Sequence, residues 1–298
     1  MYPIIAKLGP FTLHTFGVVL ATAILVGSAI LSREARRLGD PQITEEKLQR
    51  LIWYIVLAVV FGGRLMHCIV EWRYFSAHPA KILAIWEGGL VFYGGFIATF
   101  FTVVGFAIRN KIRILRLCDL IAPSAFFGQF IGRWGCLVAG DDYGKPMSEP
   151  IRFFFGKAVQ LPAWLGITFT SPDSLVPLPL RGVPLEPVQI FMSMKALLIS
   201  GILFWIARKK KFDGQVAGVT FVLYSFLRPI IELFRGDEDR GFVFGMSTAQ
   251  FTSIFCFTLG VLILWMAPRR LLADDLAVAQ ATPSGGSGRR GKKGLGGA

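Results

Sequence analysis

The sequence has few of the residues that build metal sites and disulfide frameworks. Only three histidines and four cysteines occur in 298 residues. The cysteines, Cys68, Cys118, Cys136 and Cys256, all fall inside apolar segments at unrelated spacings, and no two histidines stand at a metal-ligand spacing. We therefore predict no metal, no cofactor and no disulfide network.

Charge is also scarce. Charged residues make up 17% of the chain, whereas 53% of it is hydrophobic and 27 residues are phenylalanine, more apolar side chain than a soluble domain of this length needs. The formal net charge of +13 is compatible with a nucleic-acid partner, but the basic residues stand in short clusters between apolar runs and near the C-terminus. That distribution argues against nucleic acid and is typical of a polytopic membrane protein.

We predict an all-α membrane protein with about seven transmembrane helices, because a span needs about 20 mostly apolar residues. The predicted spans cover residues 15–31, 51–70, 88–108, 118–137, 189–207, 214–234 and 247–267. The first apolar run lacks a basic leading region and a small-residue cleavage site, so we interpret it as a retained span and not as a signal peptide.

Lysine and arginine alternate in frequency between the connecting loops. The loops after the first, third and fifth spans are basic, as is the stretch after the seventh, and residues 208–211 read RKKK. The other loops are poorer in these residues. Because basic loops stay in the cytoplasm, we predict an outer N-terminus and a cytoplasmic C-terminus.

One connecting segment is long, at about residues 138–187, and it falls on the outer side. It is rich in proline, phenylalanine and leucine. Two compatible interpretations remain: a structured plug packed on the spans, or a lid that meets an acylated substrate. We expect one transmembrane domain over residues 1–272 that includes this head, and a disordered basic cytoplasmic tail over residues 273–298.

The most informative stretch is FIGRWGCLVAGDDYG at residues 130–144, which places Arg133 deep in an apolar segment. An arginine at the centre of a membrane helix costs about 2.5–3.5 kcal/mol on insertion scales, so it faces a protein-lined cavity or meets an anion. Arg133 has no acid within a helical turn on its own segment. Its partner must be another helix, Asp141 or Asp142 just beyond, or a ligand.

Other spans bring polar residues to the same leaflet. Arg228 and Glu232 stand four residues apart, where they can neutralise each other, and Arg235 follows them. Arg64 lies in the outer part of the second span and Tyr93 near the outer start of the third. A lipid phosphate is the anion that a membrane always supplies, and the planar, multi-donor guanidinium matches it. We therefore predict a lipid phosphate site in the outer leaflet.

At this point the residues resemble a known family, the prolipoprotein diacylglyceryl transferases of bacterial inner membranes. The resemblance covers most of the chain, and six ordered motifs carry it. They are LHTFG at 13–17, FGGRL at 61–65, WEGGLVFYGG at 86–95, GRWGCLVAGDDYG at 132–144, EPVQIF at 186–191 and FLRPIIELFRGDEDRG at 226–241.

The resemblance implies transfer of the diacylglyceryl unit of phosphatidylglycerol to the lipobox cysteine of a prolipoprotein, with a thioether formed and glycerol phosphate released. It implies a multi-pass protein of the bacterial inner membrane whose partners are phosphatidylglycerol, the prolipoprotein signal peptide and membrane lipid. Fixed arginines would stabilise the phosphate charge that develops as the bond to the glycerol carbon breaks.

The predicted site combines the convergent polar residues with the family's motif positions. Its catalytic members are Arg133, Arg228, Tyr93 and Glu232. Its substrate-binding members are Arg133, Asp141, Gly144, Arg235, Cys136 and Arg64.

Four positions depart from the family pattern. Tyr93 stands where many members have histidine, Cys136 where they have asparagine, Asp141 where they have glutamate and Phe16 where they have tyrosine. The change at Tyr93 is the most serious, because a tyrosine with an ordinary pKa near 10 is a poor base at neutral pH. These departures motivate a second hypothesis, a catalytically silent homologue that binds lipid or prolipoprotein. A solute transporter fits less well, because the polar residues gather at one leaflet and do not cross the bilayer.

Overall fold

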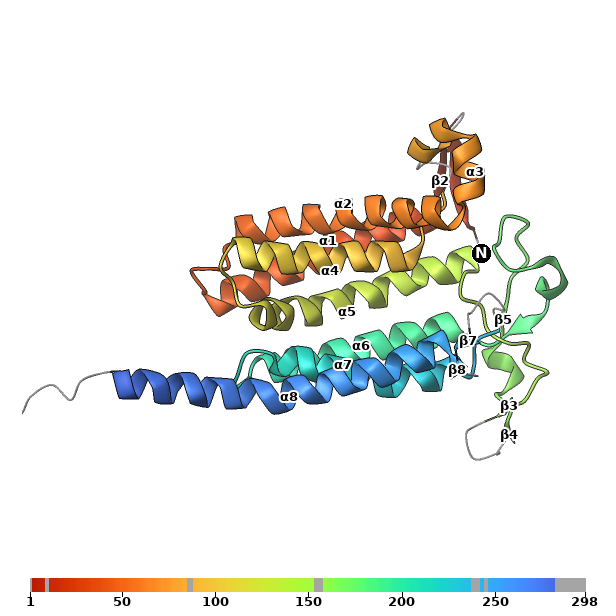
Figure 1. Cartoon of the computed structure of the whole chain (residues 1–298). Helices are drawn as coiled ribbons and strands as arrows, with labels where there is room; N and C mark the ends of the chain where they lie inside the picture. Colours follow the sequence, from red (N-terminus) through yellow and green to blue (C-terminus); the bar gives the residue numbers. More distant parts are fainter. Residues whose placement is uncertain are drawn as a thin grey trace, which may run out of the picture.

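A computed structural model describes residues 2–8, 11–84, 88–152, 158–236, 242–243 and 246–281 of the chain. Long helices run side by side, and short hairpins and loops gather at one end of them (Figure 1). We call this end, where α5 ends and α6 begins, the head end. The helices are α1 (Thr15–Leu38), α2 (Glu45–Val70), α3 (Trp72–Ala77), α4 (Phe92–Arg109), α5 (Ile114–Ala139), α6 (Val188–Ala207), α7 (Gln215–Glu232) and α8 (Thr248–Ala281).

The named strands in the described residues pair as two-stranded antiparallel sheets. They pair β1 (Ile4–Leu8) with β2 (Phe11–His14), β3 (Ile151–Arg152) with β4 (Ala158–Val159), β5 (Ile167–Thr168) with β6 (Pro184–Leu185), and β7 (Phe242–Val243) with β8 (Met246–Ser247). Short 3-10 turns lie at Pro79–Leu83, Ala163–Leu165 and Leu178–Leu180.

Six of the described helices are long and apolar enough to cross a membrane, which confirms a polytopic helical membrane protein. They are α1, α2, α4, α5, α6 and the part of α8 over Thr248–Pro268, and they match the first five predicted spans and the seventh. The sixth prediction, 214–234, corresponds to α7, which falls outside this group because Gln215, Arg228 and Glu232 make it more polar. The number seven therefore stays a prediction.

Two predicted boundaries differ from the structure. The third span was predicted from residue 88, but α4 begins at Phe92, because Gly88 and Gly89 adopt positive φ angles of 85° and 75° that interrupt a helix. The last helix continues to Ala281, past the predicted start of a disordered tail at residue 273. Residues 282–298 of that tail lie outside the described part of the chain.

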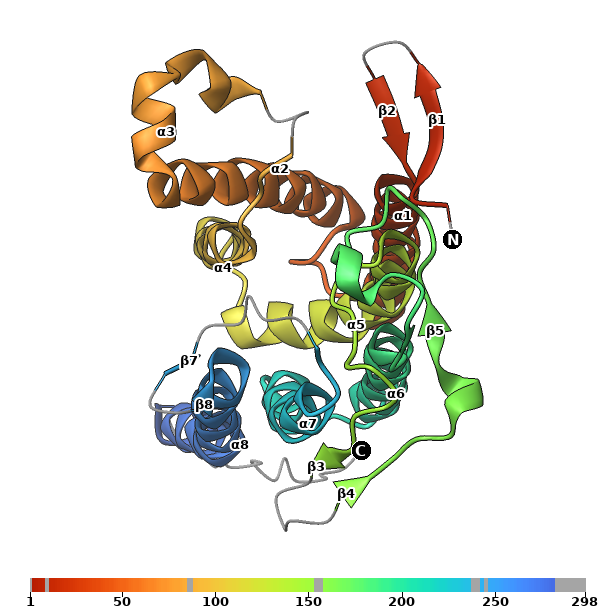
Figure 2. The same cartoon turned by 90° about the vertical axis from the view of Figure 1, so that its right-hand side faces the viewer.

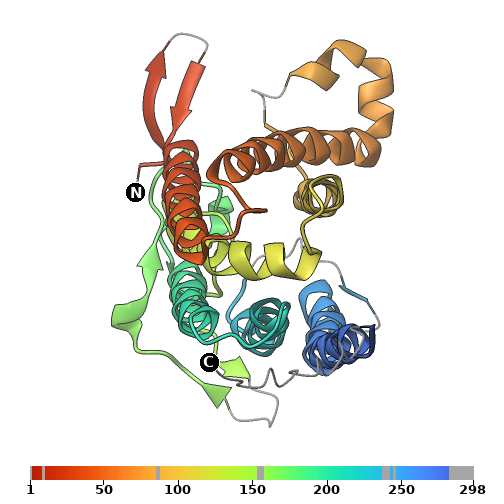
Figure 3. The same cartoon turned by 90° about the vertical axis from the view of Figure 1, so that its left-hand side faces the viewer.

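The helices pack in pairs around α5. This helix contacts α1 and α6 extensively, α2 packs on α4, and α7 packs on α8 (Figures 2 and 3). Small residues allow the closest approach: a Cβ atom at Gly62 of α2 would lie 2.6 Å from the carbonyl oxygen of Gly94 of α4. Close backbone approach at glycine is typical of helix association in membranes.

Large apolar side chains remain exposed along the outer faces of the helices. Phe92 on α4 is 76% exposed, Phe101 on the same helix 66% and Phe255 on α8 67%. So many exposed aromatic side chains on adjacent turns would be an aggregation hazard in water. They are the expected surface of helices that contact lipid.

The segment between α5 and α6 is folded and packed. Leu137 at the end of α5 and three apolar residues of this segment, Phe169, Val176 and Leu185, form a buried cluster. Arg181 supports the turn by donating hydrogen bonds of 2.8–2.9 Å to three carbonyl oxygens of residues 172–176. The segment therefore has its own small core beside the end of α5, as expected for a structured plug.

Candidate active site

Arg133 lies in the last two turns of α5 and forms an ion pair with Asp142 in the loop that follows. The helix is capped by Gly140, which has a positive φ of 78°. The Gly140 N–H donates a hydrogen bond of 2.9 Å to the Cys136 carbonyl oxygen, and the chain reverses direction here. Asp142 also has a positive φ, 50°, which is uncommon for a residue other than glycine. This turn returns the Asp142 carboxylate to Nη1 of Arg133. Of the protein partners predicted for Arg133, Asp142 is the one that forms this ion pair.

Arg235 reaches the same carboxylate from the end of α7. Its Nη2 donates to Oδ1 of Asp142 at 2.7 Å. Backbone hydrogen bonds hold the two segments together, from Gly236 N to the Tyr143 carbonyl oxygen and from Lys145 N to the Phe234 carbonyl oxygen, each 3.1 Å long. Two guanidinium groups, 102 positions apart in sequence, thus share one aspartate.

Gly144 lies where three segments meet. It pairs with Arg235 after α7, and a Cβ atom at this position would lie 2.8 Å from Cβ of Glu186 and would also collide with the Glu186 carbonyl group. Glu186, just before α6, donates its N–H to the Lys145 carbonyl oxygen at 2.9 Å. A side chain at residue 144 would therefore push apart the chain segments that position Arg235.

Arg228 and Glu232 form the i, i+4 ion pair predicted from their spacing, with Nη2 of Arg228 3.1 Å from Oε2 of Glu232. Near the end of α7, the Glu232 side chain is buried and the Arg228 side chain is 13% exposed. The pair lies within electrostatic range of Asp142, on which the Arg228 guanidinium also acts. The charges of α5 and α7 therefore form one cluster, which we call the arginine cluster: Arg133, Asp142, Arg228, Glu232 and Arg235.

Sequence reasoning missed Lys195, a buried lysine on α6 that is only 7% exposed. Its Nζ lies 4.6 Å from the ring centroid of Tyr224, one turn before Arg228 on α7. Arg133, Arg228 and Glu232 are all within electrostatic range of it. A signal was available, because a lysine inside an apolar span is as anomalous as Arg133.

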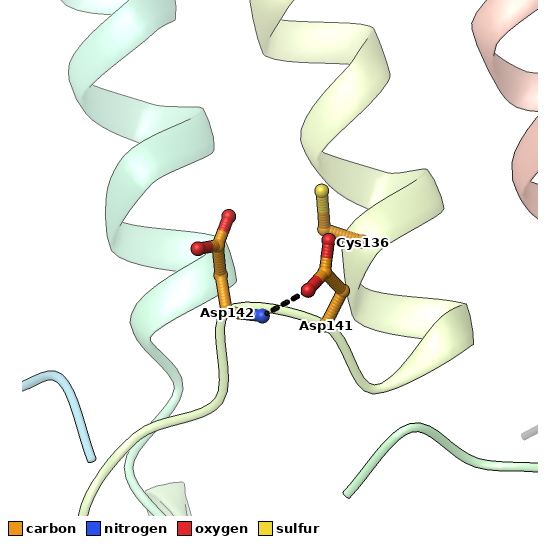
Figure 4. Close-up of side chains that lie close together, drawn as sticks. All are labelled: Cys136, Asp141 and Asp142. Carbon is orange, nitrogen blue, oxygen red and sulfur yellow. Dashed lines mark hydrogen bonds between the residues drawn. The ribbon is translucent and has the colours of Figure 1, made fainter. Parts of the chain in front are cut away.

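Cys136 and Asp141 lie beside the arginine cluster. The Cys136 thiol, the Asp141 carboxylate and the Asp142 carboxylate place one ligand atom each within 4.8 Å of one another (Figure 4). Nη1 of Arg133 also lies 3.9 Å from the Cys136 sulfur, so arginine supplies the positive charge at these three groups. Gln189 of α6 donates to the Asp141 carbonyl oxygen at 2.9 Å and fixes this turn.

The two neighbouring aspartates have opposite electrostatic environments. Burial acts to raise the pKa of Asp142, but the Arg133 and Arg235 guanidinium groups outweigh it and hold that pKa below its ordinary value. Partial desolvation by the surrounding protein and the adjacent Asp142 carboxylate raise the pKa of Asp141. Asp142 is therefore the fixed anion of the cluster, whereas Asp141 is the more easily protonated of the pair.

Two predicted site residues lie apart from the arginine cluster. Arg64 on α2 donates hydrogen bonds to five backbone carbonyl oxygens, those of Lys81, Ile82, Ala84, Gly88 and Gly89. In the described residues these contacts hold the segment before α4 in place. Tyr93, in the first turn of α4, is 53% exposed, and the described residues provide no hydrogen bond from it to the cluster.

The whole chain can also be compared with known sequences. A model of the family described as prolipoprotein diacylglyceryl transferase matches residues 3–266. The chain belongs to the prolipoprotein diacylglyceryl transferase family. Its relatives in this family include phosphatidylglycerol–prolipoprotein diacylglyceryl transferase 2 of Clostridium perfringens, which is 30% identical over 84% of this chain and 90% of the relative.

The transferases of Clostridium tetani and Geobacillus kaustophilus are 28% and 29% identical, each over 88% of this chain. The alignments cover 96% and 90% of these two relatives. Family membership therefore applies to nearly the whole membrane domain, including every helix that contributes to the arginine cluster.

Proposed function

We propose that this chain transfers the diacylglyceryl group of phosphatidylglycerol to the lipobox cysteine thiol of prolipoproteins. Family membership supports the reaction class, and the names of its relatives include the lipid donor, phosphatidylglycerol, and the protein acceptor, a prolipoprotein. The observation that carries the proposal is the convergence of Arg133 and Arg235 on Asp142 at the head end. Two guanidinium groups at one point can bind a phosphate with several charge-assisted hydrogen bonds.

In this reaction the cysteine sulfur bonds to the terminal glycerol carbon of the diacylglyceryl unit, and the bond from that carbon to the phosphate oxygen breaks. The electron pair of the broken bond stays on the oxygen, so glycerol phosphate leaves with one more negative charge. The thiol proton goes to a base, because the thiolate is the nucleophile. Fixed guanidinium groups lower the barrier by stabilising the charge that develops on the leaving phosphate.

Each predicted site residue takes a role in this proposal. Arg133 and Arg235 bind the phosphate, and Asp142 is their counter-ion when no lipid is bound. Arg228 supplies further positive charge, and Glu232 holds its guanidinium in place. Gly144 keeps the turn that positions Arg235, and Asp141 and Cys136 line it.

Tyr93 and Arg64 form the other side of the proposed site. Tyr93 offers its hydroxyl to the lipid or to the thiol proton, and Arg64 orders the segment that precedes α4. In this proposal the two-chain lipid and the signal peptide meet between these residues and the arginine cluster.

We propose that the head end faces the outer leaflet of the bacterial inner membrane, with the N-terminus outside and the C-terminus in the cytoplasm. The basic loops support this orientation, since residues 109–116 and 208–211 lie at the opposite end of the helices. We further propose that residues 1–272 act as one catalytic domain whose head, at about 138–187, covers the site.

The experiment that tests the proposal uses the full chain in liposomes, with phosphatidylglycerol labelled in its acyl chains and a lipobox peptide. We expect label on the peptide together with released glycerol phosphate, and no label on a peptide whose cysteine is replaced by serine. No transfer by folded protein that still binds the lipid would overturn the proposal and favour a silent lipid-binding homologue.

A further inference from the structure

Lys195 lies in a tightly packed helix interface at the head end. Two serines of α6 donate to backbone carbonyl oxygens of α5, Ser193 to Phe130 and Ser200 to Pro123, each at 2.8 Å. Lys195 lies between these two contacts, and its neighbours Met192, Ala196 and Ile199 are at most 1% exposed. A lysine in such an interface is costly unless an anion meets it.

The described residues do not supply that anion. Among them, no carboxylate oxygen lies within ion-pair distance of Lys195, and its ammonium group lies over the Tyr224 ring. The acid that acts electrostatically on Lys195 is Glu232. Glu232 already forms an ion pair with Arg228, in which Oε2 lies 3.1 Å from Nη2. Two of its charged neighbours, Arg133 and Arg228, have the same sign as Lys195. Cations from three helices thus gather here, with Arg133 and Arg228 both within electrostatic range of Lys195.

The depth of Lys195 follows from the contact between α5 and α6. Ser193 is level with Phe130, and the two helices run in opposite directions. At about 1.5 Å of rise per residue, the Cα atom of Lys195 lies roughly 7 Å farther from the head end than that of Arg133. A lysine side chain spans most of that distance, so its ammonium group can approach a phosphate held by Arg133 from the acyl-chain side.

We infer that Lys195 is a third phosphate-binding cation. It contacts the phosphate of the lipid donor from the acyl-chain side, while Arg133 and Arg235 bind it from the head end. This inference rests on the proposed function for the identity of the lipid. It explains why the arginine cluster is accompanied by a buried lysine for which the described residues supply no carboxylate at ion-pair distance.

The test measures substrate affinity and stability together. Lys195→Met keeps the length of the side chain and removes its charge. We expect it to raise KM for phosphatidylglycerol, and the inhibition constant of free glycerol phosphate, about tenfold, the usual effect of losing a charge-assisted hydrogen bond. The thermal midpoint should not fall, because the substitution removes a buried charge that lacks a counter-ion.

Two further variants complete the design. Lys195→Arg keeps the charge and should stay within about threefold of the wild-type KM. Lys209→Met is the matched control, because the Nζ atom of Lys209 lies 4.6 Å from the Trp205 ring at the other end of α6. We expect it to leave KM and the inhibition constant unchanged.

Several outcomes would overturn the inference. Unchanged KM and inhibition constants in folded Lys195→Met would do so, and so would a raised KM with unchanged inhibition by glycerol phosphate, which would assign Lys195 to the ester groups of the lipid. Should Lys195→Met fail to fold, the same constants measured on Lys195→Gln decide between the two results.

Different measurements would refute the role of Lys195 and the proposed function. Absence of transfer by the wild-type protein would refute the proposed function. Binding of labelled phosphatidylglycerol to wild-type and Lys195→Met protein in nanodiscs would still show whether the lysine contributes to the phosphate site, since it needs no turnover.

Discussion

The two ends of the helix pair α5 and α6 both bury charge, but they use it differently. At the end opposite the head, Lys210 lies 3.2 Å from Asp119 and 3.3 Å from Asp213. Asp119 also accepts the backbone N–H groups of Gly214 and Ala217 at 2.8 Å each. At the head end, Lys195 has no carboxylate partner in the described residues, and Arg133 and Arg235 share one aspartate.

The difference separates a structural ion cluster from a binding site. Asp119 is 2% exposed, and its contacts cap the first turn of α7 and neutralise Lys210. At the head end, the described side chains around Lys195 include no carboxylate at ion-pair distance, so its positive charge is not neutralised by a direct partner. A charged residue in an apolar span is therefore a functional indicator chiefly when its partners in the folded protein leave it unneutralised.

The largest expected effect is at Arg133. We expect Arg133→Ala to lower the rate of diacylglyceryl transfer about 100-fold or more, because it removes a cation that stabilises the leaving phosphate. Membrane insertion should stay intact. The measurement is label transfer to the lipobox peptide at equal amounts of folded protein.

Arg113 provides the matched control for this variant at the other end of α5. It lies 3.6 Å from Asp213, and its side chain is 62% exposed. Arg113→Ala should keep nearly full activity, because an exposed ion pair contributes little. Equal loss of activity in both variants would contradict the distinction between the two ends.

The second effect is on stability at Asp119. Asp119→Ala leaves the partly buried Lys210 with less counter-charge and leaves two buried N–H groups at the start of α7 without an acceptor. We therefore expect the free energy of unfolding to fall by about 3 kcal/mol. Denaturant titration in detergent micelles measures it. Transfer per folded molecule should be unchanged, and a variant as stable as the wild type would refute the structural role of Asp119.

A smaller effect is expected at Tyr93. Tyr93→Phe removes one hydroxyl that we assign to the substrates, so transfer should fall about tenfold, the upper range for a single hydrogen bond. Tyr54→Phe is the control, because Tyr54 on α2 is similarly exposed, at 50%, and its ring packs on Phe106. A full rate in Tyr93→Phe would exclude a role for the hydroxyl.

The smallest effect concerns Glu186, just before α6. Burial raises its pKa to about 7 from an ordinary 4.5, with Lys145 opposing and Glu149 adding to the shift. Because the folded protein then binds the proton more tightly than the unfolded chain, stability is greatest at low pH and falls as pH rises from about 4.5 to 7. Glu186→Gln should flatten this dependence and raise the thermal midpoint at pH 8.

The control for Glu186 is Glu149→Gln, which makes the same chemical change at an exposed residue. It should leave the thermal midpoint almost unchanged. A midpoint for Glu186→Gln that falls at pH 8 would contradict the assigned environment, because it would mean that the charged carboxylate stabilises the folded protein.

Much of the fold was predictable because membrane spans are read from local composition. Six predicted spans correspond to apolar helices, and the signal is strong because each needs only its own residues. The start of α4 was misplaced, since the positive φ angles of Gly88 and Gly89 are set by contacts with Arg64 and not by hydropathy. The segment between α5 and α6 stood out by its composition, but its two short strand pairs were not predicted.

The site was predictable only in part. Arg133 and the pair of Arg228 with Glu232 were identified from an anomaly of composition and from helical spacing, which are local properties. Lys195 carried the same anomaly and was overlooked. No local pattern in the sequence indicates that Tyr93 forms no hydrogen bond with the arginine cluster in the described residues.

The sequence by itself determined the membrane class, most of the spans and the presence of charge in the helix ends, because these depend on short windows of apolar and basic residues. Only the tertiary structure decided which charges meet. Asp142 and Arg235 are 93 positions apart, and Lys195 on a third helix lies within electrostatic range of Arg133 and Arg228. Such pairings arise from the packing of α5, α6 and α7, which no local pattern specifies.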